Sequence, residues 1–336
     1  MKFVFPTGAF ALFASLILLA SRPDSTSSEI VVPGPSPLSR SQTWTLELAS
    51  APFPAADRDG GYELDGSTYA RAEHYADSRV TVVSPSGWTA EGRVNLVFFF
   101  HGWMSAREEV LSDFDLRDQL EASGVKALLV VPELAVRAPD SFGGKFEDTG
   151  GFKRFIDELL STLDAKGLVP KARAGSIVLA GHSGAYRVIA SILRRGGLDS
   201  RIREVWLFDA LYAREEAFAD WIGKARGRFI CVSLRGGDTA ARADELVELL
   251  SKRGISPLAF DEGEEALASR LGAPVIFITS DTDHYSVVSG RSEFRTFLST
   301  SRPLVAAGRG ELRLSYARDG LGQLFRLHKR PGTADK

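Results

Sequence analysis

The chain of 336 residues is 44% hydrophobic and 25% charged, the composition of an ordinary globular protein, which excludes a largely disordered chain. Its formal net charge of −2 provides no basic excess for nucleic acid, so that class of partner is excluded. The single cysteine, Cys231, cannot form an intramolecular disulfide, and its apolar neighbours predict a buried position in a strand.

The N-terminus predicts export. Lys2 precedes an uninterrupted apolar run at 9–20, and a Ser/Pro-rich stretch follows. This order is typical of a secretory signal peptide cleaved near Ala20, so we expect residues 1–20 to be removed and the protein to be secreted or periplasmic. The alternative is an uncleaved anchor, for which the run is short and which would be the only contact with a membrane. Residues 21–42 are then a linker, 43–328 one domain and 329–336 a polar tail.

Short apolar strands alternate with helical patterns over 43–328. Strands are predicted at 43–49, 79–83, 96–100, 127–131, 177–180, 205–208, 229–234 and 275–279, and runs such as LVFFF predict strands covered on both faces. Amphipathic helices are predicted from about Phe152, Ala185 and Thr239, each ending at glycine. This alternation predicts a three-layer α/β sandwich with a mostly parallel central sheet, and the lack of a helix between the first two strands predicts an antiparallel start.

One strand-to-helix junction places a serine on a very tight turn. Residues 177–188 read IVLAGHSGAYRV: an apolar strand runs into Gly181 and His182, Ser183 follows, and a helix begins after Gly184. Such a turn exposes the hydroxyl at the carboxyl end of a strand, where ligands bind in open α/β sheets, beside the first N–H groups of a helix. The sequence resembles the G-x-S-x-G nucleophile elbow of the α/β-hydrolase superfamily, with alanine in place of the last glycine. The alternative is a βα turn without chemistry.

The same resemblance assigns further groups. His101-Gly102-Trp103 follows an apolar strand, where the family carries the second oxyanion donor, so the resemblance implies that the N–H groups of Trp103 and Gly184 form the oxyanion hole. The family's chain order of nucleophile, acid and base implies His284 as the base, because it follows the last apolar strand in a polar loop. His182 should point away from Ser183.

The acid has two candidates. Asp209 ends the apolar run VWLFD, where a carboxylate is costly without a partner, so we favour it. Asp238 follows the next strand, but it also precedes a helix, and capping would explain it without catalysis.

The resulting hypothesis is an exported, esterase-like serine hydrolase that cleaves a carboxylic ester through a Ser183–His284–Asp209 triad and an acyl-enzyme, without a cofactor or a metal. The substrate is expected to be a small molecule or cell-envelope ester or amide. Its contacts are predicted at His101, Trp103, Tyr186 and Tyr212, with the long connection at 132–152 near the cleft. A peptidase or amidase acting on envelope material, a non-catalytic binding protein with the same fold, and a tethered envelope protein remain the alternatives.

Overall fold

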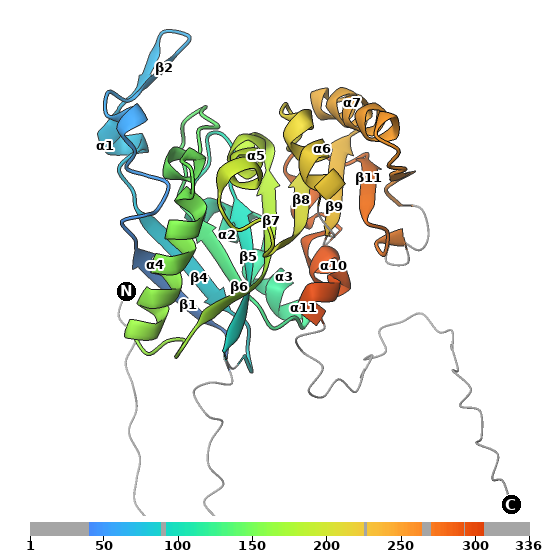
Figure 1. Cartoon of the computed structure of the whole chain (residues 1–336). Helices are drawn as coiled ribbons and strands as arrows, with labels where there is room; N and C mark the ends of the chain where they lie inside the picture. The colour runs from blue at the N-terminus through green and yellow to red at the C-terminus, as the bar shows by residue number, and fades with distance from the viewer. Residues whose placement is uncertain (1–39, 89–91, 225–226, 264–269, 292, 306–336) are drawn as a thin grey trace, which may run out of the picture. The chain divides into compact units, whose positions relative to one another are not determined.

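Nine strands form the central sheet of the computed structural model, in the order β1-β4-β6-β5-β7-β8-β9-β11-β10 (Figure 1). They span Gln42–Glu47 (β1), Arg79–Ser84 (β4), Arg93–Phe100 (β5), Leu128–Pro132 (β6), Arg173–His182 (β7), Ile202–Phe208 (β8), Arg228–Leu234 (β9), Leu258–Asp261 (β10) and Val275–Ser280 (β11). A separate hairpin pairs β2 (Tyr62–Leu64) with β3 (Ser67–Tyr69). The structure describes residues 40–88, 92–224, 227–263, 270–291 and 293–305.

The sheet is antiparallel at one edge and parallel elsewhere. Strand β4 pairs antiparallel with both β1 and β6, whereas β6, β5, β7, β8, β9, β11 and β10 pair in parallel. The predicted mostly parallel sheet and its antiparallel start are therefore confirmed, and each of the eight predicted strands has a counterpart. The hairpin β2–β3 and strand β10 were not predicted. Because the parallel strands share one direction, their carboxyl ends lie along one edge of the sheet.

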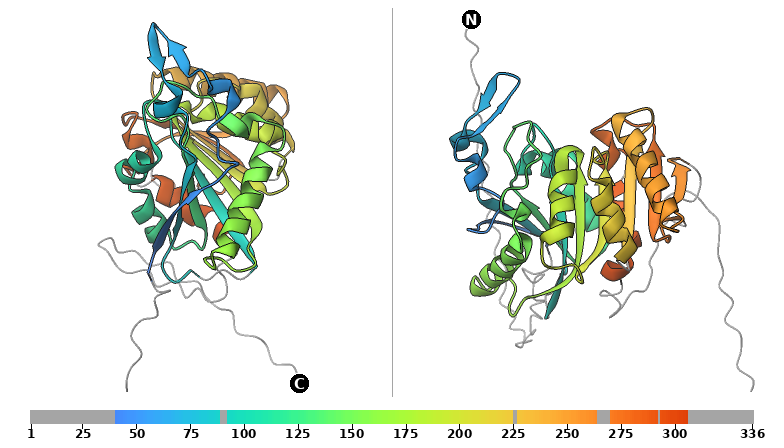
Figure 2. Two further views of the ribbon diagram at one scale, coloured as in Figure 1. Left: turned by 90° about the vertical axis from the view of Figure 1, so that its left-hand side faces the viewer. Right: turned by 45° about the horizontal axis from the view of Figure 1, so that its top comes forward.

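Helices cover both faces of the sheet (Figure 2). The α-helices are α1 (Arg71–His74), α2 (Arg107–Asp113), α3 (Leu116–Ser123), α4 (Gly151–Ala165), α5 (Tyr186–Arg195), α6 (Glu215–Lys224), α7 (Asp238–Lys252), α9 (Ser286–Ser289), α10 (Glu293–Thr300) and α11 (Arg302–Val305), with short 3₁₀ helices η2 (Ala56–Arg58), η3 (Gly144–Glu147) and η4 (Ser183–Ala185). Apolar residues of α4, α5, α6 and α7 share one buried cluster with the sheet, and those of α2, α3, α9, α10 and α11 share another. The predicted three-layer α/β sandwich is therefore confirmed.

Alternation along β5 shows how one strand serves both layers. Phe98 and Phe100 belong to the cluster beneath α4 and α5, while Val97 and Phe99 belong to the cluster beneath α3 and α10. All four side chains are fully buried. An uninterrupted apolar strand is required here because successive side chains point to opposite faces, and both faces are covered.

The segment between β1 and β4 packs against the connection between β6 and α4. The Val136 N–H donates to the carbonyl of His74 at 2.9 Å, and the Lys145 N–H donates to the carbonyl of Pro52 at 2.9 Å. The Arg58 guanidinium binds the Asp140 carboxylate at 2.7 Å and lies over the Phe142 ring. The long loop predicted at 132–152 is therefore held against the edge of the sheet where the strands end.

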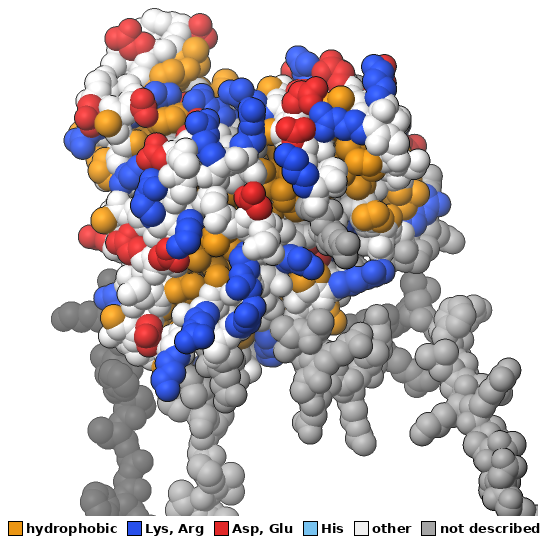
Figure 3. All heavy atoms as spheres, in the orientation of Figure 1, with side chains coloured by type: hydrophobic (Ala, Val, Ile, Leu, Met, Phe, Trp, Pro, Cys, Tyr) orange, Lys and Arg blue, Asp and Glu red, His pale blue; other side chains and the backbone are white. Residues whose placement is uncertain are grey.

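The chain divides after Ser36, and every described residue belongs to the unit that starts at Pro37. The predicted signal segment 1–20, nearly all of the linker 21–42 and the tail 329–336 lie outside the described residues. None of the described helices has the length and apolar character needed to cross a membrane. On the face drawn in Figure 3, basic and acidic side chains are interspersed with small apolar areas.

Candidate active site

Ser183 lies on the sharp turn between β7 and α5. Its φ of 55° is in the left-handed region, which costs a non-glycine residue conformational energy and is concentrated at functional sites. Gly181 permits the turn, because a Cβ there would lie 2.6 Å from the Ala185 Cβ and 2.8 Å from the Ile189 Cδ1. Strand and helix can approach this closely only over a glycine, so the backbone presents the Ser183 side chain at the strand's carboxyl end.

The loop after β5 packs directly on this turn. A Cβ on Gly102 would lie 2.6 Å from the Ser183 Cβ and 3.0 Å from the Gly184 nitrogen. The next residue, Trp103, has a backbone N–H that donates to no acceptor among the described residues. The N-terminus of α5 and the loop after β5 thus bring the two predicted oxyanion donors, Trp103 and Gly184, to the same turn.

The Trp103 side chain covers Gly184. Its indole Nε1–H donates to the Ser141 Oγ at 2.7 Å, and a Cβ on Gly184 would lie 2.6 Å from the indole Cδ1. The indole is nevertheless 49% exposed, so one part of the ring packs on the turn while the rest faces solvent. Trp103, Met104 and Tyr285, all next to candidate site residues, are the exposed large hydrophobic side chains of the described ranges.

Asp209 holds the imidazole of His284. It follows the last residue of β8, has a φ of 44° and is buried. Its Oδ2 atom accepts the Nδ1–H of His284 at 2.5 Å, and its Oδ1 atom accepts the hydroxyl of Thr239. Burial alone would raise the pKa of the Asp209 carboxyl, but these two hydrogen bonds and the charge of His284 outweigh it and lower the pKa below the ordinary value. The carboxylate is therefore ionised at neutral pH.

Of the two acids that the sequence leaves open, Asp209 is the one that contacts His284. Asp238 is the first residue of α7, and its side chain makes no hydrogen bond within the described part of the chain. The expected capping bond of Asp238 is likewise not formed.

His284 lies in the turn between β11 and α9, with its side chain 31% exposed. Because Nδ1 donates to Asp209, the neutral ring carries its free lone pair on Nε2. The Asp283 Oδ1 atom accepts the N–H groups of Tyr285 and Ser286 at 2.9 and 3.0 Å, which fixes the start of α9. The His284 ring centroid lies 4.4 Å from that of His182, the residue before Ser183. The structure thus brings His284 to the turn that carries Ser183. Within the described residues, Ser183 Oγ and His284 share no hydrogen bond, and such bonds are often long in the absence of substrate.

His101 does not face the site, contrary to its predicted contact with substrate. The side chain is buried, its Nδ1 lies 2.9 Å from the Gly102 carbonyl, and its Nε2 accepts the Leu134 N–H at 2.9 Å. Both ring nitrogens are occupied by backbone groups, so His101 fixes the loop that carries Trp103 instead.

Tyr186 and Tyr212 are half-buried and contact each other, with ring centroids 6.1 Å apart. Burial, followed by the charges of Asp209 and Asp238, raises the pKa of Tyr212 to about 12, so its hydroxyl stays protonated at neutral pH. Tyr186 lies on the first turn of α5, three residues after Ser183, and both rings therefore flank the serine and the acid along the chain.

Three further residues bind residues of the site. The sequence assigned no role there to Thr239 or His182, and Ser141 was expected only as part of the loop near the cleft. Thr239 binds the acid, Ser141 binds the Trp103 indole, and His182 contacts the base. Each is separated by 30 or more residues from its partner, so the pattern along the chain carries little signal for the pairing. Thr239 alone had one, since it follows a Gly-Gly-Asp turn at the end of a core strand.

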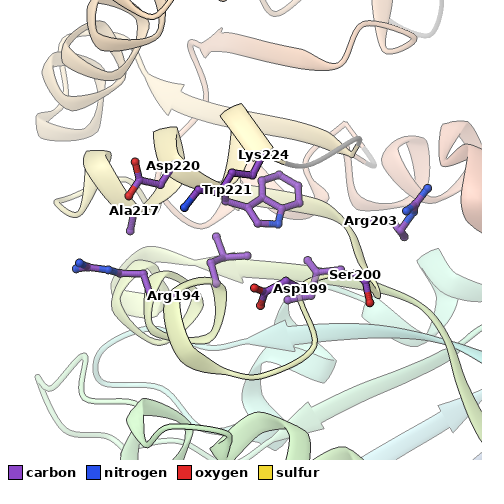
Figure 4. A pocket seen from close by; sticks show the side chains of 10 residues that line it. Arg194, Asp199, Ser200, Arg203, Ala217, Asp220, Trp221 and Lys224 are labelled. Carbon is purple, nitrogen blue, oxygen red and sulfur yellow. The ribbon is translucent and has the colours of Figure 1, made fainter.

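A cavity of about 670 Å³ lies elsewhere, between the C-terminal part of α5, the start of β8 and α6 (Figure 4). Arg194, Asp199, Arg203, Trp221 and Lys224 are among its lining residues. The residues that line this cavity include no histidine and none of the candidate site residues. Within the described ranges, no group of three or more His, Cys, Asp or Glu side chains is arranged to hold a metal ion.

No protein-family model matches the sequence, and the search of curated proteins finds no match. Several solved structures are similar in fold. A ferulic acid esterase is 14% identical, covers 77% of this chain and 99% of its own, and has a TM-score of 0.47. An S-formylglutathione hydrolase from Staphylococcus aureus is 11% identical, with coverage of 77% and 98% and a TM-score of 0.46. An esterase from Pyrobaculum calidifontis is 13% identical, with coverage of 81% and 87% and a TM-score of 0.44.

Proposed function

We propose that this chain is an exported serine hydrolase of the α/β-hydrolase superfamily, which cleaves a carboxylic ester through an acyl-enzyme. The observation that carries the proposal is the 2.5 Å bond between Asp209 Oδ2 and His284 Nδ1, with the His284 ring beside the strained turn that holds Ser183. A buried carboxylate, an oriented imidazole and a serine at the end of neighbouring parallel strands are the parts that nucleophilic acyl transfer requires.

In the proposed reaction, Ser183 Oγ attacks the ester carbonyl carbon while its proton passes to His284 Nε2. The developing oxyanion accepts hydrogen bonds from the Trp103 and Gly184 N–H groups, and each such donor contributes on the order of 3 kcal/mol of transition-state stabilisation. The C–O bond to the alcohol then breaks, and the alcohol takes the proton from His284. Water then attacks the acyl carbon while His284 Nε2 takes one of its protons. The bond between the acyl carbon and Ser183 Oγ breaks, and Oγ takes the proton back from His284 as the acid leaves. Asp209 stabilises the imidazolium in both steps.

The test of the proposal is covalent labelling with a fluorophosphonate, which reacts with an activated serine. The purified domain should label at Ser183 by peptide mass analysis, and Ser183→Ala should abolish labelling. Asp238→Asn, which changes a carboxylate outside the contact with His284, is the matched control and should label like the wild type. A folded wild-type protein that never labels and hydrolyses no p-nitrophenyl ester would reject the hydrolase and favour a non-catalytic binding protein.

The rate of hydrolysis by the same protein would then be compared for an ester and an amide that carry the same acyl group. Faster hydrolysis of the ester supports the esterase, and preference for the amide would reassign the enzyme as an amidase or peptidase.

Export is supported by Lys2 and the apolar run at 9–20, as read from the sequence. Expression of the full chain in a Gram-negative host, followed by fractionation and N-terminal mass analysis, tests it. A mature form that begins near residue 21 in the periplasm or medium is expected. Full-length protein in the membrane fraction would indicate an uncleaved anchor, and full-length protein in the cytoplasm would reject export.

A further inference from the structure

The side chain of His182 binds the backbone of the base. Its Nε2 lies 2.6 Å from the carbonyl oxygen of His284, across 102 positions of sequence. A carbonyl only accepts hydrogen bonds, so the His182 Nε2 must carry the proton. His182 is buried, with 4% of its surface exposed, and the edge contact of its ring with Phe114 has a centroid distance of 5.0 Å. The ring is therefore held from one side by an aromatic residue and from the other by His284.

The His182 ring is also neutral at neutral pH, because its pKa lies below the ordinary value. Burial, and then the charge of His284, lower the pKa of His182 to about 4. This matters because the two ring centroids are only 4.4 Å apart, and a charged His182 would oppose the protonation of His284. The nearby carboxylate of Asp209 is bound to His284 and to Thr239. His182 thus offers the base a neutral, rigid neighbour with one fixed donor.

The hydrogen bond joins two segments that are distant in the sequence, and it therefore constrains the distance between them. His182 is the last residue of β7, and the peptide bond after it leads to Ser183. His284 lies on a partly exposed turn, and among the described residues its side chain makes one hydrogen bond, through Nδ1 to Asp209. A second point of attachment, at the backbone of His284, fixes where that turn lies relative to β7. The attachment point on β7 is one residue from the nucleophile, so it sets the separation of Ser183 Oγ and His284 Nε2.

We propose that His182 is a positioning residue, whose Nε2–H bond to the His284 carbonyl holds the general base beside the turn that carries Ser183. This rests on the proposed function. The position between the glycine and the serine of the elbow, which the sequence analysis expected to point away from Ser183, is then part of the machinery and acts through the base.

The test compares His182→Leu, which keeps much of the volume and removes the donor, with His182→Gln, whose side-chain N–H₂ can reach the same carbonyl. With p-nitrophenyl esters, His182→Leu should lower kcat by about 10- to 100-fold, the range for loss of accurate positioning, while KM changes less than 3-fold by the same logic. His182→Gln should recover most of kcat.

Two results would overturn the proposal. One is His182→Leu with the kcat of the wild type. The other is equal loss of kcat in both variants with an equal loss of Tm, since that pattern reports packing and not the donor.

A measurement independent of turnover separates this proposal from the proposed function. The Nδ1 proton of His284, held against Asp209, should give a downfield ¹H NMR resonance that Asp209→Asn removes. We expect the resonance to be kept in His182→Gln and broadened or lost in His182→Leu. If the wild type fails to label with fluorophosphonate but the resonance behaves in this way, the proposed function fails and the positioning role stands. If the resonance is unchanged in His182→Leu, the positioning role is rejected even in an active enzyme.

Discussion

Thr239 donates its hydroxyl to the Oδ1 atom of Asp209, whose Oδ2 atom accepts the Nδ1–H of His284. Thr239 is buried at the start of α7, which follows β9, and Asp209 follows β8. The second oxygen of the acid is thereby satisfied inside the protein, since a buried carboxylate with an unused acceptor would lose free energy relative to water. The helix that follows β9 thus supports the carboxylate at the end of the neighbouring strand β8.

Thr239→Val removes this hydroxyl and keeps the side-chain shape. Hydrogen bonds to charged groups contribute about 1.5–3 kcal/mol, so we expect kcat/KM for an ester to fall by about 10-fold or more and the pKa of Asp209 to rise. Thr239→Ser, which keeps the donor, should stay near the wild type. Steady-state kinetics decide the matter: equal rates in Val and Ser variants would show that the hydroxyl has no role in holding the acid.

The acid itself is tested by a matched pair of substitutions. Asp209→Asn should lower kcat by about 10⁴-fold, because the neutral amide no longer fixes the tautomer of His284 or stabilises its charged form. Asp238→Asn makes the same chemical change at the other candidate acid, which is exposed. It should change kcat by less than about 3-fold, as expected for a surface substitution. If Asp238→Asn lost activity while Asp209→Asn kept it, Asp238 would be identified as the acid instead.

The contact between Trp103 and Gly184 predicts non-additive effects. Gly184→Ala places a Cβ 2.6 Å from the indole Cδ1 of Trp103, and such overpacking costs about 1–3 kcal/mol of stability. The rate of fluorophosphonate labelling should fall, since the added Cβ displaces the turn that carries the proposed oxyanion donor, the Gly184 N–H. In the double variant with Trp103→Ala, most of the stability should return, giving a coupling energy of at least about 0.5 kcal/mol. Chemical denaturation of the four proteins measures it, and strict additivity would contradict the contact.

A buried ion pair ties the C-terminal helices to the sheet. Arg228 Nε binds Glu204 Oε2 at 2.7 Å, and its other nitrogens donate to the carbonyls of Leu271 and Phe297, while Ser301 donates to Glu204. Arg228→Met leaves the carboxylate buried without its partner, so the free energy of unfolding should fall by about 3–5 kcal/mol. Urea denaturation gives the value. Esterase activity of the folded fraction should persist, because the pair lies at the opposite ends of β8 and β9 from Asp209.

Glu293 predicts a pH-dependent stability. Burial, and then its hydrogen bond with Glu262, raise the pKa of Glu293 from an ordinary value of 4.5 to about 8. The folded state therefore binds a proton that the unfolded state has released. This contribution to stability is complete below about pH 4.5 and is lost as the pH rises through about 8. Thermal unfolding should show Tm decreasing from pH 5 to pH 8.5 more steeply in the wild type than in Glu293→Gln. Parallel curves for the two proteins would show that Glu293 does not hold the proton.

The sequence predicted the layers of the fold better than the contacts of the site. Apolar runs such as LVFFF and helical spacing after Phe152 are local signals, and they define strands and helices without knowledge of distant residues. Ser183 and Asp209 are marked in the same way, because each follows a core strand directly. The pairing of Thr239 with Asp209 and of His182 with His284 could not be predicted in this way, because the partners lie 30 and 102 positions apart in the sequence.

His101 shows the reverse error. Its place beside Gly102 in a motif of the resembled family suggested contact with substrate, but a strand-terminal histidine can also satisfy backbone groups, and here the carbonyl of Gly102 and the N–H of Leu134 occupy both ring nitrogens. A pattern in the chain identifies the loop that matters, whereas only the direction of the side chain tells which of its residues faces solvent.

The backbone angles of Ser183 and Asp209, 55° and 44° in φ, have a consequence for the evolution of this chain. Glycine would adopt both conformations without steric cost, so at each position the more robust protein is the one that has lost its reactive group. Selection for heat resistance alone would drift toward an inert scaffold. Directed evolution of this domain must therefore screen turnover in every round.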